Sequence, residues 1–121
     1  MTTEEIEPGE WASFGASFSD RHRGWLVRAT RWTPAGCEQR LFDRVALEHL
    51  EIDTRADPPR LLCVAQGTDA CTLVSLVSDA PRRVLALHAD GGDLGLRVET
   101  ADGGATELRF RVPARPEHVD A

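Results

Sequence analysis

The sequence contains no lysine, no tyrosine and no asparagine, and its single methionine is Met1. The lack of lysine excludes Schiff-base chemistry and the lysine of phosphate-binding loops, and the lack of tyrosine excludes a phenolic acid or base. Without asparagine there is no acceptor for N-glycosylation. All 14 cationic side chains belong to arginine. This bias indicates a GC-rich bacterial coding genome rather than a functional demand for guanidinium groups.

Cysteine, long apolar runs and positive charge are also scarce. The three cysteines form no CxxC motif, so we expect free thiols and a reducing, cytoplasmic location rather than a disulfide framework. No apolar run approaches the roughly 18 residues of a membrane span, and the acidic start lacks the basic region of a signal peptide, so no membrane partner is predicted. The formal net charge of −6 argues against nucleic acid as a partner.

The length and composition predict a single domain over residues 1–121. The chain is 41% hydrophobic and 28% charged, as globular domains are. It contains no internal repeat and no linker that would divide it. Residues 1–7 and 113–121 are predicted to be flexible tails, because the second segment carries two prolines and both offer little to bury.

The first predicted element is an amphipathic helix near the N-terminus. Trp11, Phe14 and Phe18 recur at helical spacing and so form one aromatic stripe. Pro8 suits the first helical position, and Gly24 is placed to end the helix in the left-handed conformation. Because a helix cannot cover its own stripe, we expect the rest of the chain to supply a broad apolar surface against it.

The rest of the chain has the pattern of a sheet, in which short apolar or alternating runs are separated by turn residues. Residues 40–53 fit either a helix or a strand, and the alternation at Leu50 and Ile52 favours a strand over residues 47–53. The fold predicted is α+β, with one N-terminal amphipathic helix packed on a curved antiparallel meander sheet of five to seven strands. The predicted strands are residues 25–32, 47–53, 61–66, 70–77, 84–88, 94–100 and 105–112.

Charge pairing selects the register that we predict for the last hairpin. One register sets Arg97 opposite Glu107, whereas its neighbour sets Arg97 opposite Arg109, and like charges directly opposed are unfavourable. The first register also leaves a three-residue loop whose last residue is a glycine, as such loops require. It predicts the pairs Leu96–Leu108 and Leu94–Phe110, the loop 101–103 and a left-handed Gly103.

The hairpin after Arg60 leaves two registers open. A two-residue turn at Gly67 and Thr68 would send the side chains of Cys63 and Cys71 to opposite faces of the sheet. A three-residue turn would instead place the two cysteines beside each other, where they could form a disulfide.

Two segments of the chain resemble a known family. Residues 10–26 read E-W-A-S-F-G-A-S-F-S-D-R-H-R-G-W-L, and residues 96–111 read L-R-V-E-T-A-D-G-G-A-T-E-L-R-F-R. Both are similar to the ends of a family of short bacterial proteins catalogued only as a domain of unknown function. The resemblance implies a compact α+β domain and no particular activity. Family members carry a Thr-His pair on the strand that corresponds to residues 70–77, where this chain has Thr72 but no histidine.

The sequence predicts no catalytic, cofactor-binding or metal-binding residues. The serines lack a G-x-S-x-G elbow, no cysteine has a neighbouring histidine, and the glycine-rich residues 91–95 lead into a strand rather than a helix. His49, Glu51 and Asp53 share one face of a strand, where a solvated surface is the simpler interpretation than a metal site.

A tentative contact surface lies at the junction of the helix and the first strand. His22 and Trp25 could line a small polar pocket there, although a helix-capping histidine and a core tryptophan also explain them. Trp25, Arg28 and Trp32 are the candidates for an exposed contact strip, unless both tryptophans belong to the core. His88 with Asp90 at a strand end is a weaker candidate pair.

The function predicted from these features is a non-enzymatic binding or protein-interaction module. Its partner would be an unknown protein or a small ligand, because a curved meander offers edge strands and a concave face. One alternative is a small-molecule enzyme with a pocket near His22, which a cavity joining His22 to another histidine or a carboxylate would favour. The other alternative is a structural homo-oligomer, such as a homodimer, formed by pairing of sheet edges. No cofactor is predicted.

Overall fold

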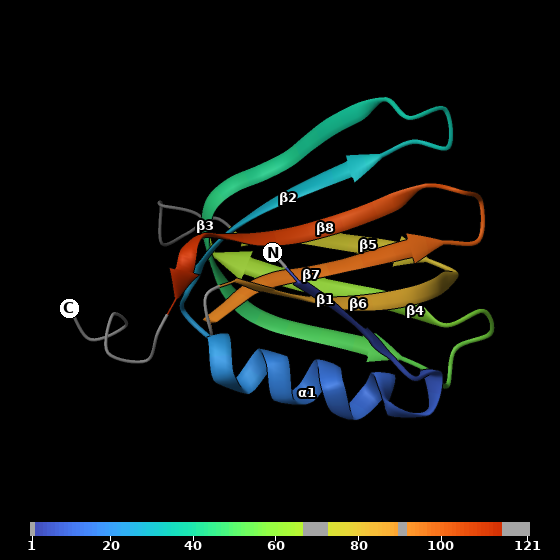
Figure 1. The fold of residues 1–121 in the computed structure, drawn as a ribbon, viewed down its shortest axis with the longest axis horizontal. Helices are drawn as coiled ribbons and strands as arrows, with labels where there is room; N and C mark the ends of the chain where they lie inside the picture. Colours follow the sequence, from blue (N-terminus) through green and yellow to red (C-terminus); the bar gives the residue numbers. More distant parts are fainter. Residues whose placement is uncertain (1, 67–72, 90–91, 115–121) are drawn as a thin grey trace.

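The computed structural model describes residues 2–66, 73–89 and 92–114 (Figure 1). Its α-helix, α1 (Trp11–His22), follows a single 3-10 turn, η1 (Pro8–Glu10). No helix among the described residues is long and apolar enough to cross a bilayer. The strands are β1 (Thr2–Ile6), β2 (Leu26–Trp32), β3 (Glu38–Asp53), β4 (Arg60–Gln66), β5 (Leu73–Asp79), β6 (Pro81–Ala89), β7 (Gly92–Thr100) and β8 (Ala105–Ala114).

The strands of the described chain form one antiparallel sheet in the order β1-β6-β7-β8-β2-β3-β4-β5. Strands β2 to β5 form one meander and β6 to β8 another, and pairing between β2 and β8 joins the two. Strands β1 and β5 are the edges of the sheet. The predicted α+β class and antiparallel sheet are confirmed, with eight strands rather than the five to seven expected.

The additional strand is β1, so the prediction of a flexible tail over residues 1–7 is wrong for residues 2–6. Strand β1 pairs with β6 along its whole length. Ile6 at its end is buried, and its carbonyl oxygen accepts a hydrogen bond from Trp11 Nε1 at 2.9 Å. This contact fixes the strand to the start of α1. At the other end, β8 continues to Ala114, and the remainder of the predicted tail 113–121 lies outside the described residues.

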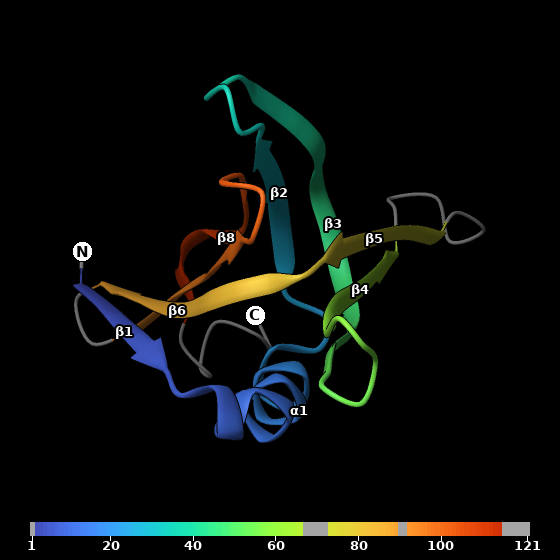
Figure 2. The same cartoon turned by 90° about the vertical axis from the view of Figure 1, so that its right-hand side faces the viewer.

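Helix α1 covers the open side of the curved sheet (Figure 2). Trp11 and Phe18 of the aromatic stripe are buried, and Phe14 packs against the same core. Gly15 allows the helix to approach β3 closely, since a Cβ atom there would lie 3.2 Å from the backbone nitrogen of Ile52. The sheet therefore supplies the apolar surface that the stripe requires.

The ambiguous segment 40–53 is a strand, because β3 runs from Glu38 to Asp53 and pairs with both β2 and β4. Leu50 and Ile52 are buried while Glu51 between them and His49 before them are exposed, which is the alternation typical of a strand. The strand begins earlier than predicted because its first half pairs with β2, beyond the edge of the core.

The last hairpin adopts the register that charge pairing selected, with a positive φ of 94° at Gly103. The predicted opposition of Leu94 and Phe110 is wrong, because the pairing of β7 with β8 shifts between Asp93 and Gly95. The confirmed pairs are Leu96 with Leu108 and Arg97 with Glu107.

Both registers considered for the hairpin of Cys63 are wrong. Strands β4 and β5 begin to pair at Gln66 and Leu73, which places Cys63 opposite Leu76. Cys71 lies outside the described residues. The thiol of Cys63 is free and fully buried, and this burial raises its pKa to about 12. Cys63 is thus an apolar core residue rather than a reactive thiol.

Candidate functional site

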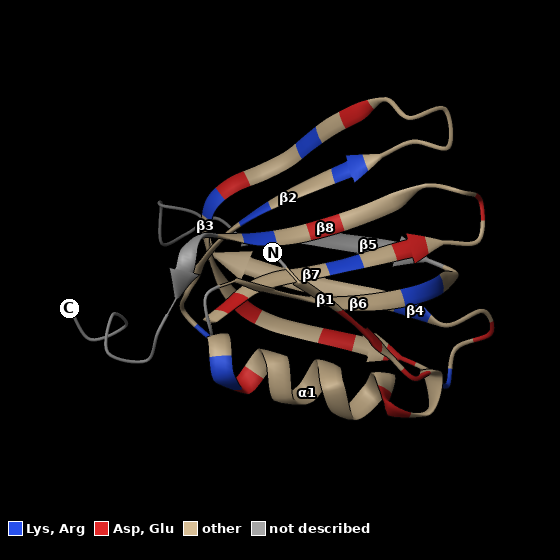
Figure 3. Cartoon of the chain, in the orientation of Figure 1, with Lys and Arg blue, Asp and Glu red and all other residues tan. Residues whose placement is uncertain are grey.

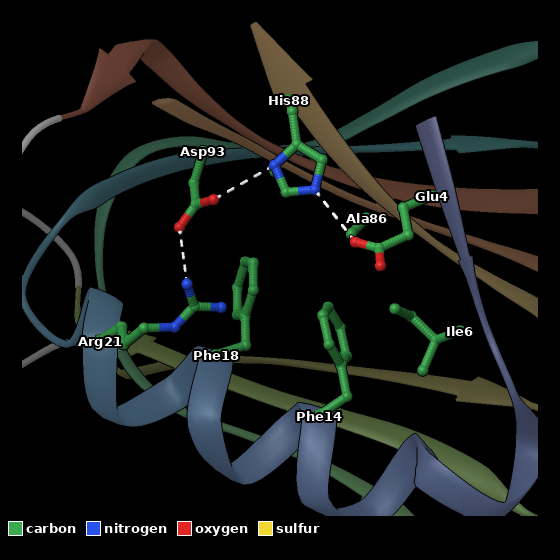
Figure 4. Close-up of a pocket in the computed structure, with 9 residues that line it drawn as sticks. Glu4, Ile6, Phe14, Phe18, Arg21, Ala86, His88 and Asp93 are labelled. Carbon is green, nitrogen blue, oxygen red and sulfur yellow. Dashed lines mark hydrogen bonds and ion pairs between the residues drawn. The ribbon is translucent and has the colours of Figure 1, made fainter. Parts of the chain in front are cut away.

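A cavity of about 240 Å³ lies between α1 and the strands β1, β6 and β7. In Figure 4, the side chains of Ile6, Phe14 and Phe18 form an apolar wall on one side of it. Drug-sized sites occupy roughly 300–1,000 Å³, so this cavity suits a smaller molecule. Its polar side chains are Glu4, Arg21, His88 and Asp93.

Asp93 reaches this cavity because β7 is irregular at Gly95. The pairing of β7 with β8 shifts between these two residues, and Gly95 adopts a φ of 152°. A Cβ atom at Gly95 would overlap the carbonyl oxygen of Leu108 and lie 2.9 Å from Arg109 Cα, so only glycine fits. The irregularity leaves Leu94 lining a different cavity, while Asp93 turns towards α1.

The carboxylate of Asp93 is the centre of a polar network. Its Oδ2 lies 2.7 Å from His22 Nε2 and 3.2 Å from Arg21 Nη1, and its Oδ1 lies 3.3 Å from His88 Nδ1. The side chain is only 24% exposed, so these three partners replace most of its hydration. One carboxylate thereby connects the end of α1 with β6 and β7.

His22, at the end of α1, is fully buried against the rings of Phe18, Trp25 and Phe110. Its Nδ1 donates to the Phe18 carbonyl oxygen at 2.7 Å, and a carbonyl can only accept. In the neutral ring Nε2 therefore carries no proton, and protonation of the ring turns its contact with Asp93 into a charged hydrogen bond. Burial lowers the pKa of His22, and the hydrogen bonds to Asp93 and Phe18 oppose burial without outweighing it.

His88 lies between two carboxylates at the mouth of the cavity. Its Nδ1 faces Asp93 as described above, and its Nε2 lies 3.4 Å from Glu4 Oε1 (Figure 4). The Glu4 side chain is 68% exposed, and this long contact is its only polar contact within the described residues. Glu4 is therefore the most exposed polar side chain of the cavity, and the Nε2 edge of His88 lies beside it.

The four residues of the predicted contact surface do not form one surface. His22 is inside the protein, and Trp25 packs against the core with its ring centroid 4.5 Å from that of His22. This placement agrees with a helix-capping histidine and a partly buried tryptophan packed on the core. Arg28 and Trp32 are partly exposed along β2, where the guanidinium of Arg97 lies 5.2 Å from the centre of the Trp32 ring.

Sequence reasoning missed most of the polar wall of the cavity. The sequence predicts a tail for Glu4 and a turn for Asp93. A signal was present, because Gly95 interrupts an otherwise alternating strand, and an isolated glycine in a strand often marks an irregularity. Within residues 2–66, 73–89 and 92–114, no three His, Cys, Asp or Glu side chains gather as metal ligands would, and His49 is exposed.

The chain was compared with protein-family models, curated proteins and solved structures, and none of them matches it. The similarity of its two ends to a family of short bacterial proteins therefore stays a prediction. The geometry of the cavity is the basis for any functional assignment.

Proposed function

We propose that this protein is a non-enzymatic binding domain whose ligand occupies the cavity between α1, β1, β6 and β7. The observation that carries the proposal is the division of this cavity into an apolar wall and a polar wall built by residues distant in sequence. Small-molecule sites combine mostly apolar walls with a few placed polar groups in this way.

The polar wall indicates the chemistry of the ligand. Asp93 is already occupied by three partners, and the cation of Arg21 is one of them. Glu4 and His88 remain for the ligand, and the carboxylate of Glu4 can only accept hydrogen bonds. The ligand would be a small molecule with an apolar body and a hydrogen-bond-donating head, such as an ammonium or hydroxyl group.

Benzylamine, benzyl alcohol and benzoate test this proposal, because they share one ring and differ in the head group. NMR titration should show saturable binding of the amine and the alcohol, and none of benzoate, which the carboxylates of the cavity would repel. Glu4→Gln should weaken benzylamine binding by about tenfold, the usual effect of losing a charged hydrogen bond. Glu5→Gln is the matched control, because Glu5 pairs with Arg83 on the other face of β1.

Two outcomes would contradict the proposal. One is failure of both benzylamine and benzyl alcohol to bind. The other is equal weakening by Glu4→Gln and Glu5→Gln, which would place the binding elsewhere. Ala86→Leu gives an independent measurement, since Ala86 lines the cavity and a larger side chain would fill it. This variant should lose both ligands while it keeps the fold.

The contact of His88 Nδ1 with Asp93 Oδ1 supports a second candidate, a small-molecule enzyme. A carboxylate that holds one ring nitrogen orients the other as a general base. Recovery of a bound probe distinguishes the two functions. Unchanged benzyl alcohol and uncleaved benzyl acetate after prolonged incubation would favour binding, whereas hydrolysis of benzyl acetate that His88→Gln abolishes would favour catalysis.

A further inference from the structure

We infer that a second site, on the outer face of β2, β3 and β8, binds a small oxyanion of the phosphate type. A cavity of about 350 Å³ lies there, apart from the one described above. Three guanidinium groups and one carboxylate line it, in a protein with a formal net charge of −6. The charged residues that line it are Arg28, Arg44, Arg109 and Asp43.

The pairing of β2 with β8 brings the first two arginines together. Arg28 lies directly opposite Arg109, so both side chains are on the same face of the sheet. Like charges at such positions destabilise a sheet. Glu107 contacts Arg109 Nε at 2.9 Å and also Arg97 at 3.5 Å, so this carboxylate is shared between two arginines.

A β-bulge adds the third arginine. In the pairing of β2 with β3, Val27 is opposite Val45 and Ala29 is opposite Phe42, so two residues of β3 face the single residue Arg28. These two residues are Asp43 and Arg44. Bulges redirect side chains in this way and are frequent next to functional sites.

The backbone at this bulge is strained. Arg44 adopts a φ of 58°, a conformation that favours glycine over residues with a side chain. Strain of this kind persists at functional sites, where a side chain is required in an unfavourable position. The lining carboxylate, Asp43, also lies 3.9 Å from Arg40 Nη1. The arrangement therefore concentrates guanidinium groups at a cost in both electrostatic and conformational energy.

A bound phosphate group offsets the electrostatic part of that cost. Guanidinium groups bind phosphate oxygens with two parallel hydrogen bonds, and a doubly negative ion offsets the repulsion among three cations. The site shares no charged residue with the cavity near Asp93, so the two proposals can fail separately. Either inorganic phosphate or a phosphate monoester could supply this chemistry.

The test is an NMR titration with sodium phosphate and with phenyl phosphate, each against sodium chloride at matched ionic strength. Saturable shifts of the Arg28, Arg44 and Arg109 side-chain signals are expected with phosphate. Phenyl phosphate binding more tightly than inorganic phosphate would identify an ester as the ligand, and the reverse order would identify the free ion. Absence of saturation with both compounds would overturn the inference.

Two arginine variants test whether phosphate binds at this site, and the second serves as a control for nonspecific effects of removing an arginine. Arg28→Gln should weaken phosphate binding by about tenfold. Arg82→Gln is the matched control, because Arg82 lines another arginine-containing cavity on β6 and β7. If Arg82→Gln weakened binding and Arg28→Gln did not, the inference would be wrong.

Arg44→Gly gives the sharpest result, since it removes a guanidinium and relieves the positive φ together. We expect weaker phosphate binding and an equal or higher denaturation midpoint. An Arg44 with a purely structural role would give the opposite pattern, which is unchanged phosphate binding and a lower denaturation midpoint.

In Figure 3 the positively charged segments of β2, β3 and β8 lie side by side towards the left end of the sheet.

Discussion

Replacement of Gly95 by alanine is expected to destabilise this protein severely. The methyl group would overlap the carbonyl oxygen of Leu108 and lie 2.9 Å from Arg109 Cα. These neighbours are backbone atoms, so no side-chain rotation relieves the overlap, and β7 and β8 would have to separate. A φ of 152° is also a conformation that alanine rarely adopts.

The expected loss of stability follows from the strained backbone conformation and the steric overlap. A strained backbone conformation costs about 1–3 kcal/mol, and overpacking costs about 1–3 kcal/mol, so the free energy of unfolding should fall by roughly 2–6 kcal/mol. A domain of this size has a total stability of only about 5–15 kcal/mol. The variant should therefore unfold at a much lower urea concentration, or show no cooperative transition at all.

Gly9→Ala is the matched control, because a Cβ atom at Gly9 meets nothing within 4 Å. It should leave stability unchanged or raise it by about 0.4–1 kcal/mol through the unfolded chain. Urea denaturation followed by tryptophan fluorescence measures both variants. A Gly95→Ala protein within about 0.5 kcal/mol of the unmodified protein would refute the reasoning, and with it the account of how Asp93 reaches the cavity.

The remaining predictions concern the polar network and the thiols. Asp93→Ala should lower the free energy of unfolding by about 1–3 kcal/mol, because it leaves Nε2 of buried His22 without a partner, and an equally stable variant would contradict this. The lowered pKa of His22 means that the folded protein takes up its proton less readily than the unfolded chain, so stability present above pH 6.5 should decline as the pH falls below it. His22→Gln should reduce the dependence of the urea midpoint on pH between pH 7 and pH 5, and an unchanged dependence in this variant would contradict the prediction. A thiol reagent should label exposed Cys37 in the native protein but not Cys63, whose buried thiol has its pKa raised to about 12, and peptide mapping that found Cys63 modified without unfolding would be inconsistent with this.

Local patterns in the sequence were sufficient to predict the fold class. The spacing of Trp11, Phe14 and Phe18 indicates the helix, and the cost of exposing three aromatic rings requires a covering sheet. The charges of Arg97 and Glu107 select the register of the last hairpin, because both residues lie close together along the chain. In such cases the competing structures differ in short-range interactions, which can be evaluated from the sequence alone.

The binding sites depend on pairings between distant segments. Glu4 is on β1 only because residues 2–6 pair with β6, more than 70 positions away, and this pairing has no local signature. Asp93 turns inward because Gly95 packs against β8, and Arg44 faces Arg28 because of a bulge between β2 and β3. The register shifts by three residues between Asp93 and Gly95 and by one residue at the bulge, and a shift by an odd number of residues reverses the face on which a side chain lies.

The sequence by itself determined the α+β class, the amphipathic helix, most of the strands and the closing hairpin, since periodicity, turn residues and nearby charges act over a few positions. The tertiary structure alone decided the strand order, the two irregularities and the cavities beside them. The physical reason is that register and bulges are set by contacts across the sheet, whose energies depend on which strands become neighbours.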